Sequence, residues 1–478
     1  MLVAHLLYSA QIFEPSGGIP WKLNLTAVSS QRCMLFVARN KHILSFEIQH
    51  YAREPSFKAC LSYPEPVQGD EINAITLGHH CDCEIIVAVY DSGRTVAWKL
   101  DDNFSLLWDW SGRVSTWGCA IHGESGQLAT SANSHTISVL HMPQSVDNTE
   151  IHSQLRPEAL ELSGHSGNIP YISFSATGKY LVSSSIDSTI RVWSVHSGQQ
   201  SFVYKHNQWC WAACFVYPFF FAPRDIEKGP QVPSTSSGWP DNDFVDSESL
   251  SSHDSNTHNA DRPHTSTVDD YTDDIANGLI SSDADIYTEA ELESDAESEL
   301  ESAANSSHDP RVTLVQPTVP MTPESDSPGT ASPMLLCCTR SEVLLLDPAL
   351  PADAAVVDKI ENAVSRTLIP SLIDIMLFDR ITFVEWIPEM SVAIVGSFSG
   401  TVAVIELQSG VHNTQHRMKV LFRLPQRPTS RQLYGMSIFH HPIDRSKFRA
   451  VTLYMTYIDG KMLAYELYFQ EDAVADIS

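Results

Sequence analysis

An internal repeat constrains the fold of this chain more than any other feature of its sequence. The clearest copy is Leu162–Val195, in which polar turns separate three short runs rich in β-branched and aromatic residues. These runs are Tyr171–Phe174, Tyr180–Ser185 and Thr189–Ser194. Alternating side chains between such turns are typical of antiparallel strands and not of helices. The copy therefore predicts a three-stranded meander.

The same pattern recurs along the chain. Further copies begin at Leu23, Ile72, Trp117, Ile381 and Leu433, and one more is split between Trp209–Phe221 and Pro333–Asp347. Strand-like runs between copies, such as Phe104–Trp110, fit a fourth, outer strand. Seven four-stranded copies predict an all-β fold, a seven-bladed WD40-type β-propeller, because each small sheet can bury its faces against its neighbours in a closed ring. We expect Leu2–Ile12 to provide the outer strand of the last blade and so close the ring.

One segment interrupts the repeat and carries most of the charge. Of the formal net charge of −28, the stretch between Asp241 and Asp309 contributes −19, from 20 acidic residues and one basic residue, Arg262. The surrounding residues, 223–332, are rich in Ser, Asp, Glu, Thr and Pro and cannot bury enough apolar surface to offset their ordering entropy. The sequence predicts blades 1–4 and the first strand of blade 5 in residues 1–222. It also predicts one long disordered acidic insertion in residues 223–332. The rest of blade 5 is expected in residues 333–478, together with blades 6 and 7.

The global charge and the cysteines exclude several classes of protein. A strongly acidic chain disfavours direct binding to nucleic-acid phosphates, which requires Lys and Arg. The nine cysteines are odd in number and form no CxxC pairs, and the cluster His79–Cys83 has no second half to complete a metal site. The longest apolar run, Trp209–Ala222, is too short to span a bilayer and contains Pro218. We therefore expect no metal, no cofactor, no membrane contact and no nucleic-acid contact, in a protein of the nucleus or cytoplasm.

Four residues of the clearest repeat have the types found in a hydrolase triad. They are His165, Ser183 (with Ser185 as the alternative serine), Asp187 and Trp193. Ser, His and Asp together can form a nucleophile and its base. In a repeat they also form a buried relay, in which Asp accepts from the imidazole, the imidazole engages Ser, and Ser accepts from the Trp indole. We interpret the set as this structural tetrad and expect no catalytic residues and no small-molecule substrate.

Two further features bear on regulation. Candidate phosphorylation sites, followed by acidic residues or by Pro, are Thr288, Ser294, Ser298, Thr322, Ser327 and Ser332. A basic stretch predicted on an outer strand and its loop contains Arg417, Lys419, Arg423, Arg427 and Arg431. This basic stretch is either a solvated edge that blocks aggregation or a docking edge for an acidic partner or for the acidic insertion. The insertion is correspondingly either a regulator of access to a binding face or an inert linker.

Several segments outside the insertion together resemble a known family. They are Asn24–Ser29, Trp117–His122, Gly164–His165 with Asn168–Pro170 and Trp193, Phe378–Arg380 with Ile387–Glu389, and Tyr457–Glu466. In this order they resemble the fungal WD40-repeat family of transcriptional regulators of ribonucleotide reductase genes. The resemblance implies a non-enzymatic scaffold that controls deoxynucleotide supply in the DNA-damage response through protein partners.

Two other classes of function are open at this point. Substrate receptors of cullin-type ubiquitin ligases often carry Trp-Asp-x-Arg at the end of a blade, where this chain has Trp193-Ser194-Val195-His196. A propeller hydrolase would need a catalytic motif, and no nucleophile elbow or Gly-rich phosphate loop occurs in the sequence. Both classes are therefore less well supported than the scaffold.

Overall fold

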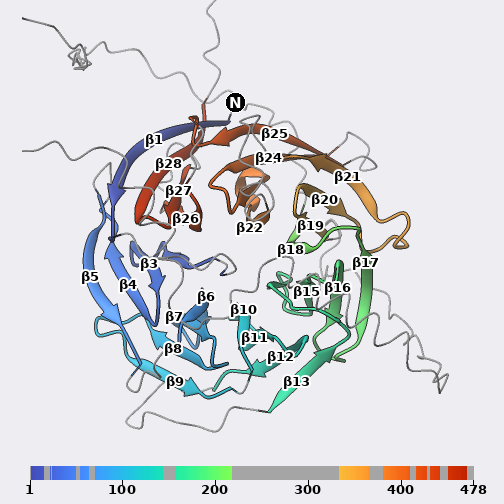
Figure 1. Cartoon of the computed structure of the whole chain (residues 1–478), viewed down its shortest axis with the longest axis horizontal. Coiled ribbons are helices and arrows are strands. Elements are labelled where there is room, and N and C mark those ends of the chain that lie inside the picture. Colours follow the sequence, from blue (N-terminus) through green and yellow to red (C-terminus); the bar gives the residue numbers. More distant parts are fainter. Residues whose placement is uncertain are drawn as a thin grey trace, which may run out of the picture. The chain divides into compact units, whose positions relative to one another are not determined.

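Seven four-stranded antiparallel sheets are arranged in a ring around a central channel (Figure 1). The computed structural model describes residues 2–14, 22, 24–49, 54–63, 70–112, 114–143, 158–217, 333–364, 380–409, 416–427, 431–441 and 450–470. All of these residues belong to one compact unit. Its only helical element in the described ranges is a single 3₁₀ turn, η2 (Pro388–Met390). The predicted all-β, seven-bladed propeller is therefore confirmed.

Each blade has one strand beside the channel and three that follow outward to the rim. In blades 1 to 3 these are β2 (Thr26–Ser29), β3 (Met34–Arg39), β4 (His42–Glu47) and β5 (Ser56–Leu61); β6 (Ile72–His80), β7 (Cys83–Tyr90), β8 (Thr95–Lys99) and β9 (Leu106–Trp110); and β10 (Thr116–His122), β11 (Gln127–Ala132), β12 (Thr136–His141) and β13 (Ala159–Ser163).

Blades 4 to 7 follow the same plan. Their strands are β14 (Tyr171–Phe174), β15 (Tyr180–Ser184), β16 (Thr189–Ser194) and β17 (Gln200–Lys205); β18 (Cys210–Val216), β19 (Met334–Thr339), β20 (Glu342–Leu346) and β21 (Val356–Glu361); β22 (Ile381–Ile387), β23 (Val392–Ser397), β24 (Val402–Ser409) and β25 (His416–Leu424); and β26 (Leu433–His440), β27 (Ala450–Tyr457), β28 (Lys461–Phe469) and β1 (Leu2–Gln11).

The second strand of a blade lies between two neighbouring sheets, and its sequence shows this. In β7, the residues Glu84–Tyr90 are all buried, and β19 and β23 are buried along their whole length. A strand covered on both faces is apolar at most of its positions, whereas the outer strands β5 and β21 are largely exposed. Uninterrupted apolar runs therefore mark the second strands, and mixed runs mark the rim.

The hydrophobic core is a ring of seven clusters, one at each junction between adjacent blades. At the junction of blades 2 and 3, for example, Ile85 and Val87 pack with Leu128 and Leu140. No blade has a core of its own, so each sheet is stable only between its neighbours.

The N-terminal strand closes the ring. β1 pairs with β28 from Leu2↔Phe469 to Gln11↔Lys461, with one irregularity between Leu6 and Tyr8. The last blade thus combines the two ends of the described chain (Figure 1). The predicted closing strand Leu2–Ile12 agrees with this pairing to within one residue at its end.

Blade 5 is split in the sequence but continuous in space. β18 and β19 are antiparallel partners, and Val216 lies opposite Met334. The predicted insertion, residues 223–332, lies outside the described residues, but the two strand ends that flank it are neighbours.

This proximity gives a prediction for the insertion. Deleting residues 230–328 and joining the ends with a short Gly/Ser linker should leave the propeller folded, because Val216 and Met334 already lie side by side and loop length enters stability only logarithmically. The expected result is an unfolding midpoint close to that of the full chain, measured by circular dichroism. Loss of cooperative melting would show that the deleted residues contribute to the core.

Candidate interaction site

The four residues of the predicted tetrad come together in blade 4. His165 precedes β14, Ser183 lies on β15, Asp187 lies in the turn after β15, and Trp193 lies on β16. His165 Nδ1 is 2.9 Å from Asp187 Oδ2, and His165 Nε2 is 2.8 Å from Ser183 Oγ. The Trp193 indole N–H donates to the same Ser183 Oγ at 2.9 Å. The relay runs from the edge of the blade into the junction of blades 3 and 4, where Trp193 packs.

The pKa shifts of His165 and Asp187 agree with a neutral imidazole in this relay. Burial lowers the pKa of His165, and the hydrogen bond to Asp187 opposes only part of that shift. Burial would raise the pKa of Asp187, but hydrogen bonds from His165, Thr189 and the Ser166 backbone outweigh it and hold the pKa below its usual range. The Nδ1–H therefore donates to Asp187, and Nε2 accepts from the Ser183 hydroxyl.

Sequence reasoning missed one member of this network, Thr189. Its hydroxyl donates to Asp187 Oδ1 at 2.6 Å and lies 3.0 Å from His165 Nδ1. A Thr two residues after a turn Asp is a recurrent local motif, because its hydroxyl and backbone N–H can both reach the carboxylate. The spacing between Asp187 and Thr189 could therefore have identified Thr189 from the sequence.

Burial separates this Ser–His–Asp set from a hydrolase triad. Ser183 has no exposed surface, and His165 is 8% exposed. Ser183 Oγ is already engaged by both His165 and Trp193, and no substrate carbonyl can approach it. The set connects β15, β16 and the segment before β14 within blade 4.

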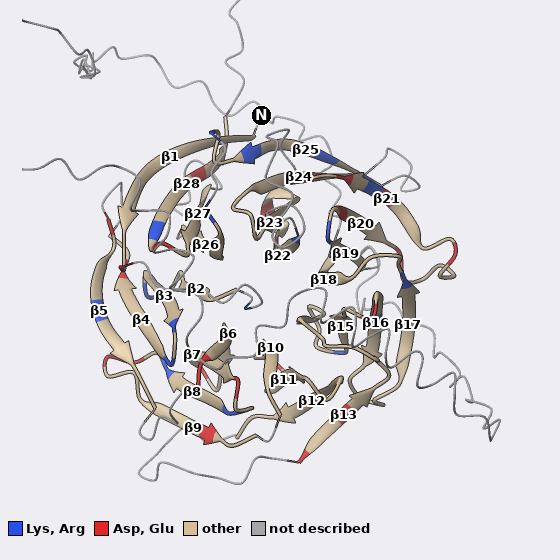
Figure 2. Cartoon of the chain, in the orientation of Figure 1, with Lys and Arg blue, Asp and Glu red and all other residues tan. Residues whose placement is uncertain are grey.

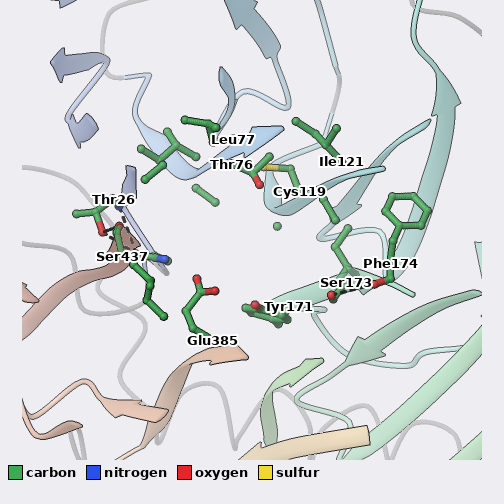
Figure 3. Close-up of a pocket in the computed structure, with 18 of the residues that line it drawn as sticks. Thr26, Thr76, Leu77, Cys119, Ile121, Tyr171, Ser173, Phe174, Glu385 and Ser437 are labelled. Atoms are coloured by element: carbon green, nitrogen blue, oxygen red, sulfur yellow. Dashed lines mark hydrogen bonds between the residues drawn. The ribbon is translucent and has the colours of Figure 1, made fainter. Parts of the chain in front are cut away.

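The inner strands of six blades line a central cavity of about 480 Å³ (Figure 3). Its lining includes Thr26 from β2, Thr76 from β6, Cys119 from β10, Ser173 from β14 and Ser437 from β26. The volume lies in the range of ligand-binding cavities, roughly 300–1,000 Å³. The channel is thus a polar-lined space large enough for a side chain or a small ligand.

Blade 5 contributes no described residue to this lining, because Tyr171 of blade 4 covers its inner strand. The Tyr171 hydroxyl donates to the Val384 carbonyl of blade 6 at 3.3 Å. The ring of Tyr171 packs against the cluster that contains Ala212 and Cys214 of β18. These small side chains leave the space that the aromatic ring fills.

Glu385 of β22 is the acidic residue that lines the cavity, and in Figure 3 its side chain points into the cavity beside Tyr171. Burial raises the pKa of Glu385 to about 7, and the positive charge of His440 opposes this rise. A carboxyl with such a pKa can be neutral or charged near neutral pH. Nothing in the order of residues along the chain marked Glu385 as a site residue.

The family comparison matches the part of the chain that contains the tetrad. Residues 157–194 match the model of the WD domain, G-beta repeat. The chain is a seven-bladed β-propeller, and its fourth blade is similar to the WD40 repeat.

Relatives support this assignment over part of their length. A WD40 repeat-containing protein of Dictyostelium discoideum is 32% identical over 199 residues, 41% of this chain and 28% of that protein. A WD repeat-containing protein of Schizosaccharomyces pombe is 28% identical over 196 residues, 37% of this chain and 40% of that protein. WD repeat-containing protein 36 of Homo sapiens is 33% identical over 110 residues, 23% of this chain and 10% of that protein. The chain thus spans well under half the length of each of these relatives.

A solved structure shows the same fold. A chain in the crystal structure of the mitotic checkpoint complex has a TM-score of 0.53 and 10% sequence identity, with 98% of this chain and 95% of that chain covered. At this identity the likeness concerns the fold alone. It agrees with the propeller fold of the described residues.

Two other blades of the ring have a simpler polar pair in place of the tetrad. In blade 2, the turn residue Asp91 accepts from the Asn73 side chain at 2.6 Å. In blade 7, the turn residue Asp459 pairs with Arg431 Nε at 2.7 Å. In both pairs, as in blade 4, an acidic turn residue is tied to the start of the first strand of its own blade. These two blades keep only the outermost link of the tetrad.

The predicted basic edge is divided among different environments. Arg417 and Lys419 are exposed on β25, the outer strand of blade 6, where Figure 2 shows basic residues at the rim. Arg423 on the same strand donates from Nε to the Ala363 carbonyl at 2.6 Å. Arg427 is exposed beyond the strand, and Arg431 pairs with Asp459. The structure therefore does not bring the five residues together as one free basic edge.

The remaining expected features are placed as follows. The six candidate phosphorylation sites, Thr288, Ser294, Ser298, Thr322, Ser327 and Ser332, lie outside the described residues. Across the described ranges, no group of three or more His, Cys, Asp or Glu side chains could hold a metal ion. In the same part of the chain, no helix is long and apolar enough to cross a membrane.

The tetrad gives a prediction about pH. Because the pKa of His165 is lowered by folding, the unfolded state takes up a proton as the pH falls below about 6.5, and stability is lost in that direction. The lowered pKa of Asp187 acts with the same sign but at lower pH, below about 4. We expect the urea midpoint to fall between pH 7.5 and pH 5.5, and to fall less in His165→Gln than in the parent. Equal pH dependence of the two proteins would show that His165 protonates equally in the folded and unfolded states.

Proposed function

We propose that this protein is a non-enzymatic WD40 scaffold that binds protein partners and regulates transcription of ribonucleotide reductase genes in the DNA-damage response. The closed ring is the observation that carries the scaffold role. Seven junction clusters hold the blades rigidly, and the turns between strands form the two faces of the ring. Turns on a rigid frame are the usual location of binding residues.

The sealed tetrad supports a non-catalytic role for the residues that most resemble an enzyme site. Ser183 and His165 are buried and engaged with each other. The transcriptional role rests on the sequence resemblance of the segments from Asn24 to Glu466, and it would operate in the nucleus or cytoplasm through partner proteins. We propose no direct contact with nucleic acid.

Partner identification is the experiment that tests this proposal. The tagged full chain is crosslinked in fungal cells, purified, and its partners are identified by mass spectrometry. In parallel, ribonucleotide reductase transcripts are measured with and without DNA damage in cells that lack the protein. We expect transcription factors or their regulators among the partners, and altered transcript levels in the deletion strain.

Other outcomes separate the alternatives. A cullin adaptor as the main stoichiometric partner, with unchanged transcripts, would replace the proposal with a ubiquitin-ligase substrate receptor. A partner set of another kind with unchanged transcripts would keep the scaffold role and reject the transcriptional one.

A further inference from the structure

Glu385 is placed in the channel without a counter-charge. Within the described part of the chain, its carboxyl has no hydrogen bond and no ion pair, and only the charge of His440 nearby favours its ionised form. His440 itself is engaged elsewhere, since its Nδ1 lies 2.7 Å from Glu389 Oε1. Glu385 is partly buried, and a charge that is removed from water is costly unless it is paired. The channel therefore contains a carboxyl group that has no hydrogen-bond or ion-pair partner among the described residues.

The position of Glu385 makes it reachable from one face of the ring. It is the fifth residue of β22, which ends at Ile387 and continues into the turn η2. The cavity lining on this side also includes Ser30, His122 and His440, each at or beyond the end of an inner strand. A long side chain that enters the channel from the face with these turns would meet Glu385 before it reaches the opposite mouth.

We propose that the channel binds the ammonium or guanidinium tip of a Lys or Arg side chain presented by a protein partner, with Glu385 as its counter-ion. This inference rests on the proposed scaffold function. The Tyr171 ring lies beside Glu385 in Figure 3 and offers a π-face of the kind on which such cations pack. Hydroxyls of Ser173 and Ser437 line the same cavity and can accept the remaining N–H donors.

The chemistry of the lining excludes other ligand classes. An anion would meet the Glu385 carboxylate with no described Lys or Arg in the lining to bind it. A divalent metal requires several ligands, and the described residues include no group of three that could hold one. A monovalent organic cation needs one carboxylate and a few neutral acceptors, which is what the channel provides.

The ionisation of Glu385 would make this binding dependent on pH. The groups that face it are Tyr171 on β14, Cys214 on β18 and His440 on β26. Burial raises the pKa values of Tyr171 and Cys214, so both stay neutral near pH 7. With a pKa of about 7 for Glu385, affinity for a cation should rise between pH 6 and pH 8.

Binding of short peptides to the full chain tests the proposal directly. The probes are blocked tripeptides of sequence Gly-X-Gly, in which X is lysine, arginine or norleucine, and free spermidine as a cation without a peptide. Affinity is measured by calorimetry or by ligand-observed NMR at pH 6 and pH 8. The variants are Glu385→Gln and, as a matched control, Glu361→Gln on the rim, where the Glu361 side chain is 62% exposed.

We expect binding to depend on the positive charge of the peptide and on the negative charge of Glu385. The lysine and arginine peptides should bind at least about 10-fold more tightly than the norleucine peptide, and Glu385→Gln should weaken them by about 10- to 100-fold. Glu361→Gln should leave them unchanged. Glu385→Gln should melt no lower than the parent at pH 8, because it removes a partly buried carboxyl whose pKa is raised by folding.

Three results would overturn the proposal. They are no binding of either cationic peptide to the parent at millimolar concentration, equal binding of the norleucine peptide, or unchanged binding by Glu385→Gln. Tighter binding of spermidine than of both peptides would assign the site to a free polyamine. Partner capture by the Glu385→Gln chain at the parental level would reject the channel site but leave the scaffold function standing.

Discussion

Replacing Trp193 with alanine is expected to lower the free energy of unfolding by about 3–5 kcal/mol, as large truncations in a packed core do. Trp193 is 2% exposed and belongs to the cluster between blades 3 and 4. Its removal leaves a cavity at a junction, and it also leaves Ser183 Oγ without one donor. Because each blade is stable only between its neighbours, the loss is transmitted to both blades.

The measurement is the urea midpoint of Trp193→Ala against the parent and against Trp117→Ala. Trp117, on the inner strand β10, is only partly buried, so its truncation should cost clearly less. Trp193→Phe should recover part of the loss, because it restores ring volume but not the indole N–H. Equal midpoints for Trp193→Ala and the parent would remove Trp193 from the core of blade 4.

Deleting residues 1–13 is expected to have an effect of similar or greater size. The deletion removes all of β1 and the buried residues Leu2 and Phe13. Burying two large apolar side chains contributes about 3–6 kcal/mol, and β28 would lose a strand that pairs with it over nine residues. The last blade would then be held to the first only by side-chain packing and by hydrogen bonds such as those between Asn24 and Met436.

Size-exclusion chromatography and thermal melting check this result. We expect a lower, broader melting transition and self-association through the exposed edge of β28. The deletion of residues 230–328 is the matched control, since it removes more chain but no described strand. A truncated protein that melts like the parent would show that the ring closes without β1.

Much of the fold could be predicted because each blade repeats a local pattern. The turns around Gly178 and Asp187 and the apolar runs of the second strands are legible within one repeat. The split of blade 5 was also predictable, since Trp209–Phe221 lacked the partners that Pro333–Asp347 could provide. Periodicity and turn residues are local signals, and they survive in weak copies.

The channel could not be predicted, because it exists only when the ring is assembled. The Tyr171–Val384 hydrogen bond joins residues that are 213 positions apart. Glu385 lies in an apolar run, and it is distinguished only by the residues that five other inner strands place around the cavity. The basic stretch shows the same limit, since the partners of Arg423 and Arg431 lie on other elements, at Ala363 and Asp459. Adjacency in sequence does not show which of these basic side chains are engaged by other elements of the fold.

The split of blade 5 has a consequence for the protein while it is being made. A ribosome adds about 5–20 residues per second, so the 117 residues between Val216 and Met334 take on the order of ten seconds to emerge. During that interval the buried strand β18, with residues Cys210–Val216, has no partner on its blade. An apolar strand with a free edge is a template for association with other nascent chains. Newly made molecules should therefore depend on chaperones at this point of synthesis, and the chain without residues 230–328 should depend on them less.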